Sequence, residues 1–338
     1  MTVLQRIWRP LYWLPQDLAY LWRARFPQLV LHWGGHSYGD YLLFGTVIAE
    51  ARRRKDCRIA VVTEREEIFR HWPGGVRFFF GEFRALQSVR LCGARLASPR
   101  YYLHQHPPVY DTPARGHIIT EMCRSAGLTG TVALRTYFYL TDEEKRRGRL
   151  VANQAVIQAT SATSLTSSWL KHWPTERYQE VVHRLSGRVQ FVQLGTEGEP
   201  ALDGVIDLRG KTTLRESAAI LARSRLYVGY VGFLMHLARA VDIRSVIVFG
   251  GRERPDQSGY ACNENLFTPL SCSPCWRLST CDYDRLCMQR ITIEQVVDAV
   301  KRVLAKEGSP LELSHEDIPA TPTEFSLPWK QESFIPPV

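Results

Sequence analysis

The chain has 338 residues, 45% of them hydrophobic and 23% charged, a globular composition that excludes collagen, coiled-coil and low-complexity proteins and suggests two domains. Charged residues and prolines interrupt every apolar run before it reaches the roughly 20 residues that span a bilayer, so we expect no transmembrane segment. The 43 basic and 34 acidic side chains leave a net charge of +9, which favours an anionic partner, but no zinc-finger spacing, RNP signature or helix-turn-helix indicates nucleic acid.

The first 25 residues are rich in aromatic and basic side chains. Arg6, Arg9, Pro10 and Pro15 interrupt the apolar stretch that a secretion signal requires, so we expect a cytoplasmic protein. Two interpretations of this opening stay open, since Trp and Tyr suit both settings. It is either a helix packed on the first domain or a segment on the membrane surface, which predicts peripheral contact with the inner membrane.

Residues 1–150 are predicted to form a first α/β domain. The apolar run at 29–33 predicts a buried strand, and a glycine-rich turn leads from it to a helical repeat over 41–54. Residues 58–63 predict the next strand, and this alternation is typical of a parallel sheet. A helix is predicted from Thr141 to about 151, at the domain boundary.

A second alternating series covers 151–308 and is the clearest pattern in the sequence. The predicted strands are 155–159, 189–194, 226–229 and 245–249, and the predicted helices are 176–185, 214–223, 233–241 and 293–306. Thr213 and Glu216 predict a capping box for one of these helices. The remaining residues, 309–338, are rich in proline and predict an extended tail.

Two features of the second domain suit a bound anion. A glycine turn ends at Gly232 before a helix, so backbone N–H groups and the helix dipole face the ligand side. The hydroxyl-rich run at 160–168 is followed by Lys171, and hydroxyls with a lysine suit a diphosphate.

Several motifs in this order resemble the ADP-heptose:lipopolysaccharide heptosyltransferase family, which is glycosyltransferase family nine. They are residues 171–174 before a helix, 193–195 at a strand end, 208–214, and 235–240 leading to 249–251. In the first half, residues 35–43 are similar to the glycine and aspartate turn that opens the family's first helix. The resemblance implies a GT-B architecture, in which two Rossmann-like domains face each other across a cleft. The N-terminal domain would bind the acceptor and the C-terminal domain the nucleotide sugar.

The resemblance also implies an inverting glycosyltransferase that needs no nicotinamide or flavin cofactor. Such an enzyme moves a sugar, here heptose, from a nucleotide diphosphate to a glycan such as lipopolysaccharide core, or to a protein hydroxyl. Asp40 would be the general base, although a turn or cap role at a helix start also suits it. Two alternatives are a GT-B nucleotide-sugar epimerase or hydrolase, and a non-catalytic GT-B scaffold stabilised by a metal.

For the donor, the resemblance implies that Lys171 holds the diphosphate and that Gly232 supplies backbone donors. Glu199 would accept hydrogen bonds from the ribose hydroxyls, with Glu197 as the alternative. The other donor-site candidates in these motifs are Thr166, Ser167, Gly195, Thr213, Leu214 and His236. A packed histidine is an equally good interpretation of His236. Val231 stands where the family usually has an acidic residue, which leaves the donor sugar open.

Four cysteines, Cys272, Cys275, Cys281 and Cys287, lie in a polar and aromatic loop at 262–288. Four thiolates at this spacing suit a structural zinc or iron site, with no coordination position left for substrate. The alternative is a set of reduced thiols or two disulfides. The loop also resembles that of the autotransporter heptosyltransferases, in which it binds iron and supports assembly, so the resemblance further implies a homo-oligomer.

Overall fold

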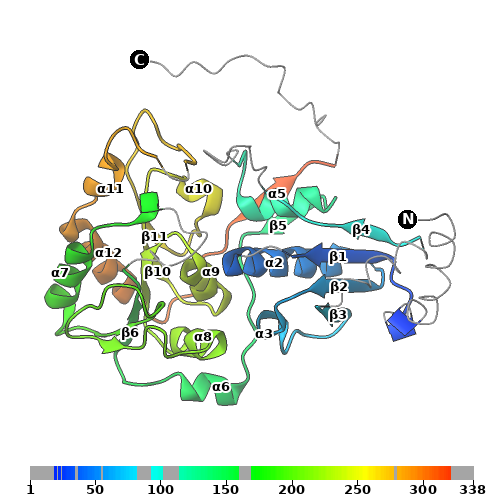
Figure 1. Ribbon diagram of the computed structural model, residues 1–338, viewed down its shortest axis with the longest axis horizontal. Helices are drawn as coiled ribbons and strands as arrows, with labels where there is room; N and C mark the ends of the chain where they lie inside the picture. Colours follow the sequence, from blue (N-terminus) through cyan, green and yellow to red (C-terminus); the bar gives the residue numbers. More distant parts are fainter. Residues whose placement is uncertain are drawn as a thin grey trace, which may run out of the picture.

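The computed structural model consists of two parallel sheets with alternating helices, which lie side by side (Figure 1). It describes residues 19–20, 22–23, 25–34, 37–54, 56–81, 93–101, 114–159, 169–277 and 280–320. The predicted α/β class is confirmed. No helix among these residues has the length and apolar character needed to cross a membrane.

The first sheet has the strand order β3-β2-β1-β4, and all neighbouring strands are parallel. Its strands are β1 (Leu29–Trp33), β2 (Ile59–Thr63), β3 (Val76–Phe80) and β4 (Arg95–Ala97). β1 and β2 are buried apolar runs, as expected of strands covered on both faces. The helices that follow these strands are α2 (Tyr38–Arg54), α3 (Glu66–Phe69) and α5 (Ile118–Ser125).

The second sheet has the order β11-β10-β9-β6-β7-β8 and is parallel throughout. Its strands are β6 (Gln154–Ile157), β7 (Gln190–Gln193), β8 (Ile206–Asp207), β9 (Tyr227–Tyr230), β10 (Ser245–Gly250) and β11 (Glu264–Phe267). Its helices are η1 (Trp169–Lys171), α7 (Thr175–Leu185), α8 (Leu214–Ala222), α9 (Phe233–Ala240), α10 (Pro255–Ser258), α11 (Leu286–Gln289) and α12 (Ile293–Ala305). The four strands and four helices predicted here are present. The edge strands β8 and β11 were not predicted, because half-buried strands lack a clear apolar pattern.

A two-stranded ribbon joins the end of the described chain to the first half. β12 (His315–Ile318) pairs antiparallel with β5 (Gly130–Ala133). The carboxylate of Glu316 accepts hydrogen bonds from the backbone N–H of His117 and the hydroxyl of Thr120, both at 2.9 Å. The chain therefore crosses back from the second sheet and is fastened beside α5.

The segment between the two sheets contains α6 (Asp142–Arg147), which begins as predicted and ends earlier. Thr141 and Glu144 form a capping box at its start. The helix was expected to reach about residue 151 but stops before Gly148. A β-carbon at Gly148 would collide with the carbonyl oxygen of Ala219 in α8, so close packing on α8 sets this end of the connector.

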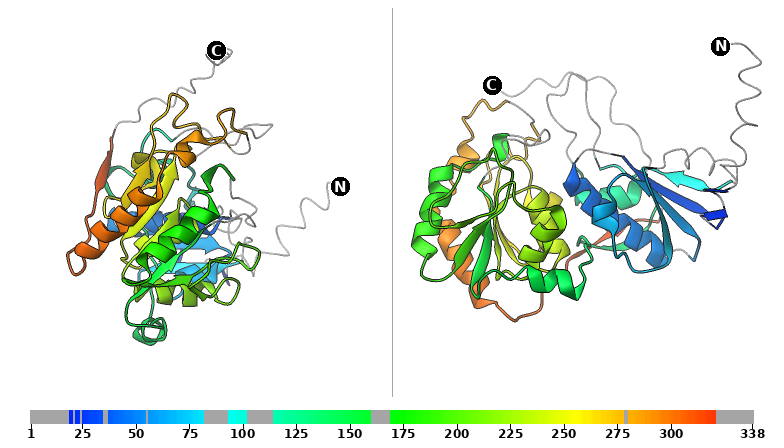
Figure 2. Two further views of the ribbon diagram at one scale, coloured as in Figure 1. Left: turned by 90° about the vertical axis from the view of Figure 1, so that its left-hand side faces the viewer. Right: turned by 60° about the horizontal axis from the view of Figure 1, so that its bottom comes forward.

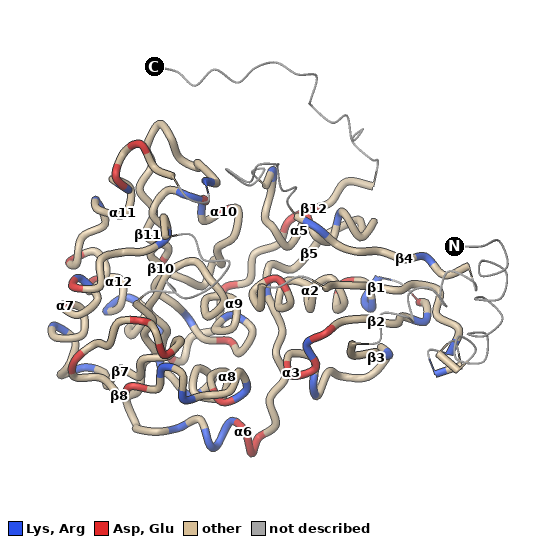
Figure 3. The backbone as a smooth tube through the Cα atoms, in the orientation of Figure 1, with Lys and Arg blue, Asp and Glu red and all other residues tan. Residues whose placement is uncertain are grey.

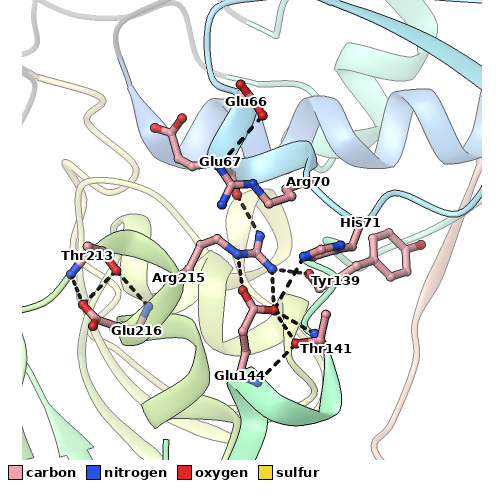
Figure 4. Close-up of polar contacts among 10 residues, drawn as sticks. All are labelled: Glu66, Glu67, Arg70, His71, Tyr139, Thr141, Glu144, Thr213, Arg215 and Glu216. Atoms are coloured by element: carbon pink, nitrogen blue, oxygen red, sulfur yellow. Dashed lines mark hydrogen bonds and ion pairs between the residues drawn. The ribbon is translucent and has the colours of Figure 1, made fainter. Parts of the chain in front are cut away.

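Arg215, in the first turn of α8, ties the second half to the connector and to the first half (Figure 4). Its Nε and Nη2 bind the two carboxylate oxygens of Glu144 at 2.5 and 2.8 Å. Nη2 also donates to the carbonyl of Tyr139 at 2.8 Å, and Nη1 donates to the carbonyl of Glu67 in α3 at 2.9 Å. The side chain of Arg215 is only 10% exposed, so this guanidinium fixes three segments at a nearly dry junction.

We expect Arg215→Met to lower the free energy of unfolding by about 2–3 kcal/mol, because Glu144 and two carbonyls lose a charged donor. Hydrogen bonds from Arg215 hold the pKa of Glu144 at about 2 instead of 4.5. The contribution of the Arg215–Glu144 pair to the free energy of unfolding is present above pH 4.5 and is lost as the pH falls towards 2. The loss of stability in acid should therefore be smaller in the variant. Urea unfolding at neutral and acidic pH measures both effects.

The control for this prediction is Arg146→Met, which breaks an exposed pair with Glu143. It should change the free energy of unfolding much less than Arg215→Met does, since solvent screens an exposed ion pair. Equal destabilisation by the two substitutions would contradict the junction role of Arg215.

Candidate active site

The second sheet has a topological switch point at β6. From β6 the chain continues to β7 and β8 on one side, and it later returns to β9 and β10 on the other side. In parallel α/β sheets ligands bind outside the carboxyl ends of the strands at such a point. Lys171, Glu199 and Gly232 follow β6, β7 and β9 in the chain, so the predicted donor-binding residues come from this edge.

Lys171 is paired with a buried carboxylate. Its Nζ lies 2.5 Å from Oε1 of Glu253, and the same oxygen lies 3.0 Å from Nη1 of Arg252. Burial opposes ionisation of Glu253, but the charges of Lys171 and Arg252 prevail and hold its pKa at about 2. At neutral pH the cluster has two positive charges and one negative charge, and its net positive charge suits an anion.

Glu199 is buried among polar groups after β7. Gln158, at the end of β6, donates from Nε2 to its two oxygens at 3.1 and 3.4 Å, and the Thr196 hydroxyl donates to Oε1 at 3.4 Å. Burial still raises the pKa of Glu199 to about 7. Gly195 has a φ of +150°, and a β-carbon there would collide with the Glu199 carboxylate. The glycine therefore leaves the space that this carboxylate occupies.

Asp40 lies in the first turn of α2 and is 6% exposed. The hydroxyl of Tyr101 donates to its Oδ1 at 3.0 Å. The first turn of α2 packs directly on the first turn of α9, since a β-carbon at Gly39 would lie 3.3 Å from Cδ2 of His236. The predicted base is thus held beside the N-terminus of α9, where Gly232 is the cap residue. Figure 2 shows the two halves meeting along α2 and α9.

His236 is buried at the junction of the two halves. Its Nδ1 lies 2.6 Å from the hydroxyl of Tyr260, and its carbonyl accepts a hydrogen bond from Thr136 at 2.6 Å. Burial lowers the pKa of His236 to about 3, so the imidazole is neutral at physiological pH. The sequence left two interpretations of His236, a donor contact and a packed histidine, and these contacts are typical of a packed histidine.

The other donor-site candidates have different surroundings. Gly232 caps α9 without a side-chain hydrogen bond, so the first N–H groups of this helix suit an anion. The Thr213 hydroxyl accepts from the N–H of Glu216 at 3.2 Å, and the predicted capping box is confirmed. Leu214 is half-buried against the apolar core. Thr166 and Ser167 lie outside the described residues.

Cys272, Cys275, Cys281 and Cys287 are all free thiols. Burial raises the pKa of Cys275 and Cys287, and the neighbouring thiols of the loop raise both further. Within the described ranges, no group of three or more His, Cys, Asp or Glu residues is arranged to hold a metal ion. The four thiols as they lie do not fit a metal, and the four-cysteine site stays a prediction.

Gln158 and Glu253 were not among the residues predicted for the site, although the sequence carries a signal for both. Gln158 follows β6 and Glu253 follows β10. Polar residues directly after buried parallel strands meet at one edge of the sheet, so they belong among the candidates for a site.

A cavity lies away from this edge, at the start of the first sheet. Its volume is about 730 Å³ and its lining contains only basic and aromatic or apolar side chains. The lining residues are Trp22, Arg23, Arg25, Phe26, Arg58, Arg77, Phe78 and Phe79. Trp22 and Phe26 are 75% and 52% exposed. No carboxylate pairs with Arg25, Arg58 or Arg77 in the part of the chain that the structure describes.

A family model matches part of this chain. The model of glycosyltransferase family 9 (heptosyltransferase) matches residues 133–281. The resemblance that the motifs indicated is confirmed over this range, and so is the prediction of a glycosyltransferase. Asp40 lies outside the match. No curated protein matches the chain by sequence.

Three solved structures illustrate the shared fold. A family 9 glycosyltransferase from Veillonella parvula is 14% identical, with a TM-score of 0.60 over 83% of this chain and 98% of that one. The iron-containing dodecameric glycosyltransferase TibC from enterotoxigenic E. coli is 17% identical, with a TM-score of 0.64 over 83% and 76%. E. coli ADP-heptose lipopolysaccharide heptosyltransferase II is 14% identical, with a TM-score of 0.58 over 82% and 99%. The predicted GT-B-like arrangement is confirmed.

We expect Glu199→Gln to remove a pH dependence of stability. The folded pKa of about 7 lies above the ordinary value of 4.5, so the contribution of Glu199 is full below pH 4.5 and is lost as the pH rises through 7. The melting temperature of the wild type should therefore fall relative to that of the variant between mildly acidic and mildly alkaline pH. Thermal unfolding across this range measures the difference, with the exposed Glu197→Gln as control. A difference in melting temperature between the wild type and Glu199→Gln that stays constant with pH would contradict the raised pKa of Glu199.

Proposed function

We propose that the chain is an inverting heptosyltransferase that uses ADP-heptose in the cytoplasm. The match of residues 133–281 to glycosyltransferase family 9 supports this proposal. The acceptor is a hydroxyl group of a glycan such as lipopolysaccharide core, or of a protein. The observation that carries the proposal is the contact between α2 and α9, since it sets Asp40 beside an uncapped helix N-terminus that suits a diphosphate.

The proposed reaction is a single displacement. The acceptor oxygen attacks the anomeric carbon and forms the new glycosidic bond, while the bond from that carbon to the diphosphate oxygen breaks. The acceptor proton passes to the carboxylate of Asp40, and the leaving diphosphate keeps the electron pair. Lys171 and the N–H groups at Gly232 stabilise the charge that develops on the diphosphate. Glu199 accepts hydrogen bonds from the ribose hydroxyls of the donor.

A calorimetric titration with ADP, GDP, UDP and their sugar conjugates tests the donor. Selective binding of ADP or ADP-heptose supports the proposal. Preferential binding of UDP or GDP would replace ADP-heptose as the donor, and binding of none of them would favour the non-catalytic scaffold. Release of free sugar or of an epimer in the absence of acceptor would favour a hydrolase or epimerase instead.

Asp40→Asn should leave ADP affinity unchanged within about twofold and lower the rate of sugar transfer by about 100-fold or more, since the amide cannot take the proton. The transfer rates and ADP affinities of the wild type and Asp40→Asn measure the two effects separately. The matched control is Asp56→Asn, which removes an exposed carboxylate after α2 and should change neither quantity. Normal transfer by Asp40→Asn would exclude Asp40 as the base.

The basic and aromatic cavity at the start of the first sheet is proposed to contact an anionic membrane surface. Its arginines supply positive charge, and the exposed Trp22 and Phe26 suit the interface between headgroups and acyl chains. Residues 1–18 contain Arg6 and Arg9 but only one acidic residue, Asp17, so their charge does not complement the cavity. An anionic bilayer is therefore a better partner for this surface than the chain's own opening segment.

Replacing Arg25 and Arg77 together by alanine should weaken binding to vesicles that contain phosphatidylglycerol by about 30-fold, because each arginine near such a surface contributes about 1 kcal/mol. Cosedimentation with vesicles of phosphatidylethanolamine, with and without phosphatidylglycerol, measures it. Replacing the exposed Arg149 and Arg188 removes the same charge elsewhere and should have a much smaller effect. Equal losses for the two pairs would show that net charge, not this surface, determines binding.

A further inference from the structure

The cysteine-rich loop contacts the segment that carries Lys171 through Arg285. Nη1 of Arg285 donates to the carbonyl oxygen of His172 at 3.1 Å, and its Cζ lies 4.8 Å from the centre of the Trp169 ring. The backbone N–H of Arg285 donates to Sγ of Cys281 at 3.3 Å. One arginine thus joins a cysteine of the loop to residues on both sides of Lys171.

The same loop reaches Lys171 from a second direction, through Glu253. Nε of Arg252 donates to the carbonyl of Arg277 at 2.7 Å, and the backbone N–H of Trp276 donates to the carbonyl of Arg252 at 2.9 Å. The Arg252 guanidinium lies 5.4 Å from the Trp276 ring centre. Arg252 and Lys171 share the Glu253 carboxylate, at 3.0 and 2.5 Å. The loop therefore supports both the backbone and the ammonium group of Lys171.

We propose that Arg285 is a positioning residue for Lys171, and that the cysteine-rich loop keeps this lysine in the orientation that meets the donor diphosphate. The proposal rests on the proposed function, since it takes the ligand of Lys171 to be a diphosphate. A lysine side chain has several rotatable bonds, and ordering them on binding costs affinity. A turn that is already fixed by Arg285 reduces this cost.

The competing role of Arg285 is direct contact with the phosphates. Its Nε is buried and has no hydrogen-bond partner among the described residues, and a guanidinium can bind phosphate itself. The two roles differ in how they depend on Lys171. A residue that acts through Lys171 loses its effect when Lys171 is removed, whereas an independent phosphate contact keeps it.

A double-mutant cycle separates these roles. Calorimetry gives the affinities for ADP and for adenosine, which lacks phosphate, in the wild type, Arg285→Lys, Lys171→Ala and the double variant. Arg285→Lys keeps the positive charge but loses the planar contact with Trp169, and it should weaken ADP binding about tenfold without changing adenosine binding. It should cause no further loss in the Lys171→Ala background. Arg290→Lys, at an exposed position just after the loop, is the control and should bind ADP normally.

Additive losses in the cycle would overturn the positioning role, and so would equal weakening of ADP and adenosine. Hydrogen exchange of the peptide that covers Trp169–Lys171 and His172 gives a readout that needs no nucleotide. It should be faster in Arg285→Lys than in the wild type, and unchanged exchange would overturn the proposal. If the wild type binds no nucleotide, the proposed function fails, and the exchange rates still decide whether Arg285 fixes this turn.

Discussion

The contact between the first turns of α2 and α9 is the constraint on which the arrangement of the two sheets depends. Each helix follows a buried strand of its own sheet, so each N-terminus lies at the carboxyl end of that sheet. Gly39 lets the two turns approach, because a larger residue there would press on the His236 ring. The active-site side of one sheet is thereby fixed against that of the other, and Asp40 needs no mobile segment to bring it near α9.

Two further ties hold this arrangement away from the contact between α2 and α9. Arg215 joins α8 to α3 and to the connector, while β12 returns from the second sheet to pair with β5. The tie to α3 and the pairing with β5 both use backbone groups that secondary structure already holds in place. The relative orientation of the halves is therefore determined at three separate places.

The order of strands and helices could be predicted from the sequence because apolar periodicity and capping residues are local features. The box formed by Thr213 and Glu216 is an example, since its two residues are three positions apart. Contacts between distant segments were not available in this way. The pairing of Lys171 with Glu253 joins residues more than eighty positions apart, and the packed role of His236 follows from Tyr260 and Thr136, which the motif does not contain. A family motif identifies the lysine, but only the fold shows which carboxylate and which loop hold it.

In the proposed donor site, the buried pair of Lys171 and Glu253 would keep a cation ready for an anion in a place with little water. Lys171 is only 19% exposed and lies near Arg252, and both burial and a neighbouring positive charge favour the neutral amine. Glu253 offsets these effects, since a carboxylate at 2.5 Å favours the ammonium form. The ion pair with Glu253 occupies one donor of the Lys171 ammonium group. Without Glu253 the site would have a larger net positive charge as long as Lys171 stayed protonated. Burial strengthens the attraction of the ammonium group to phosphate, but it also promotes loss of the ammonium proton. Glu253 therefore belongs to the proposed anion site, although its own charge is negative.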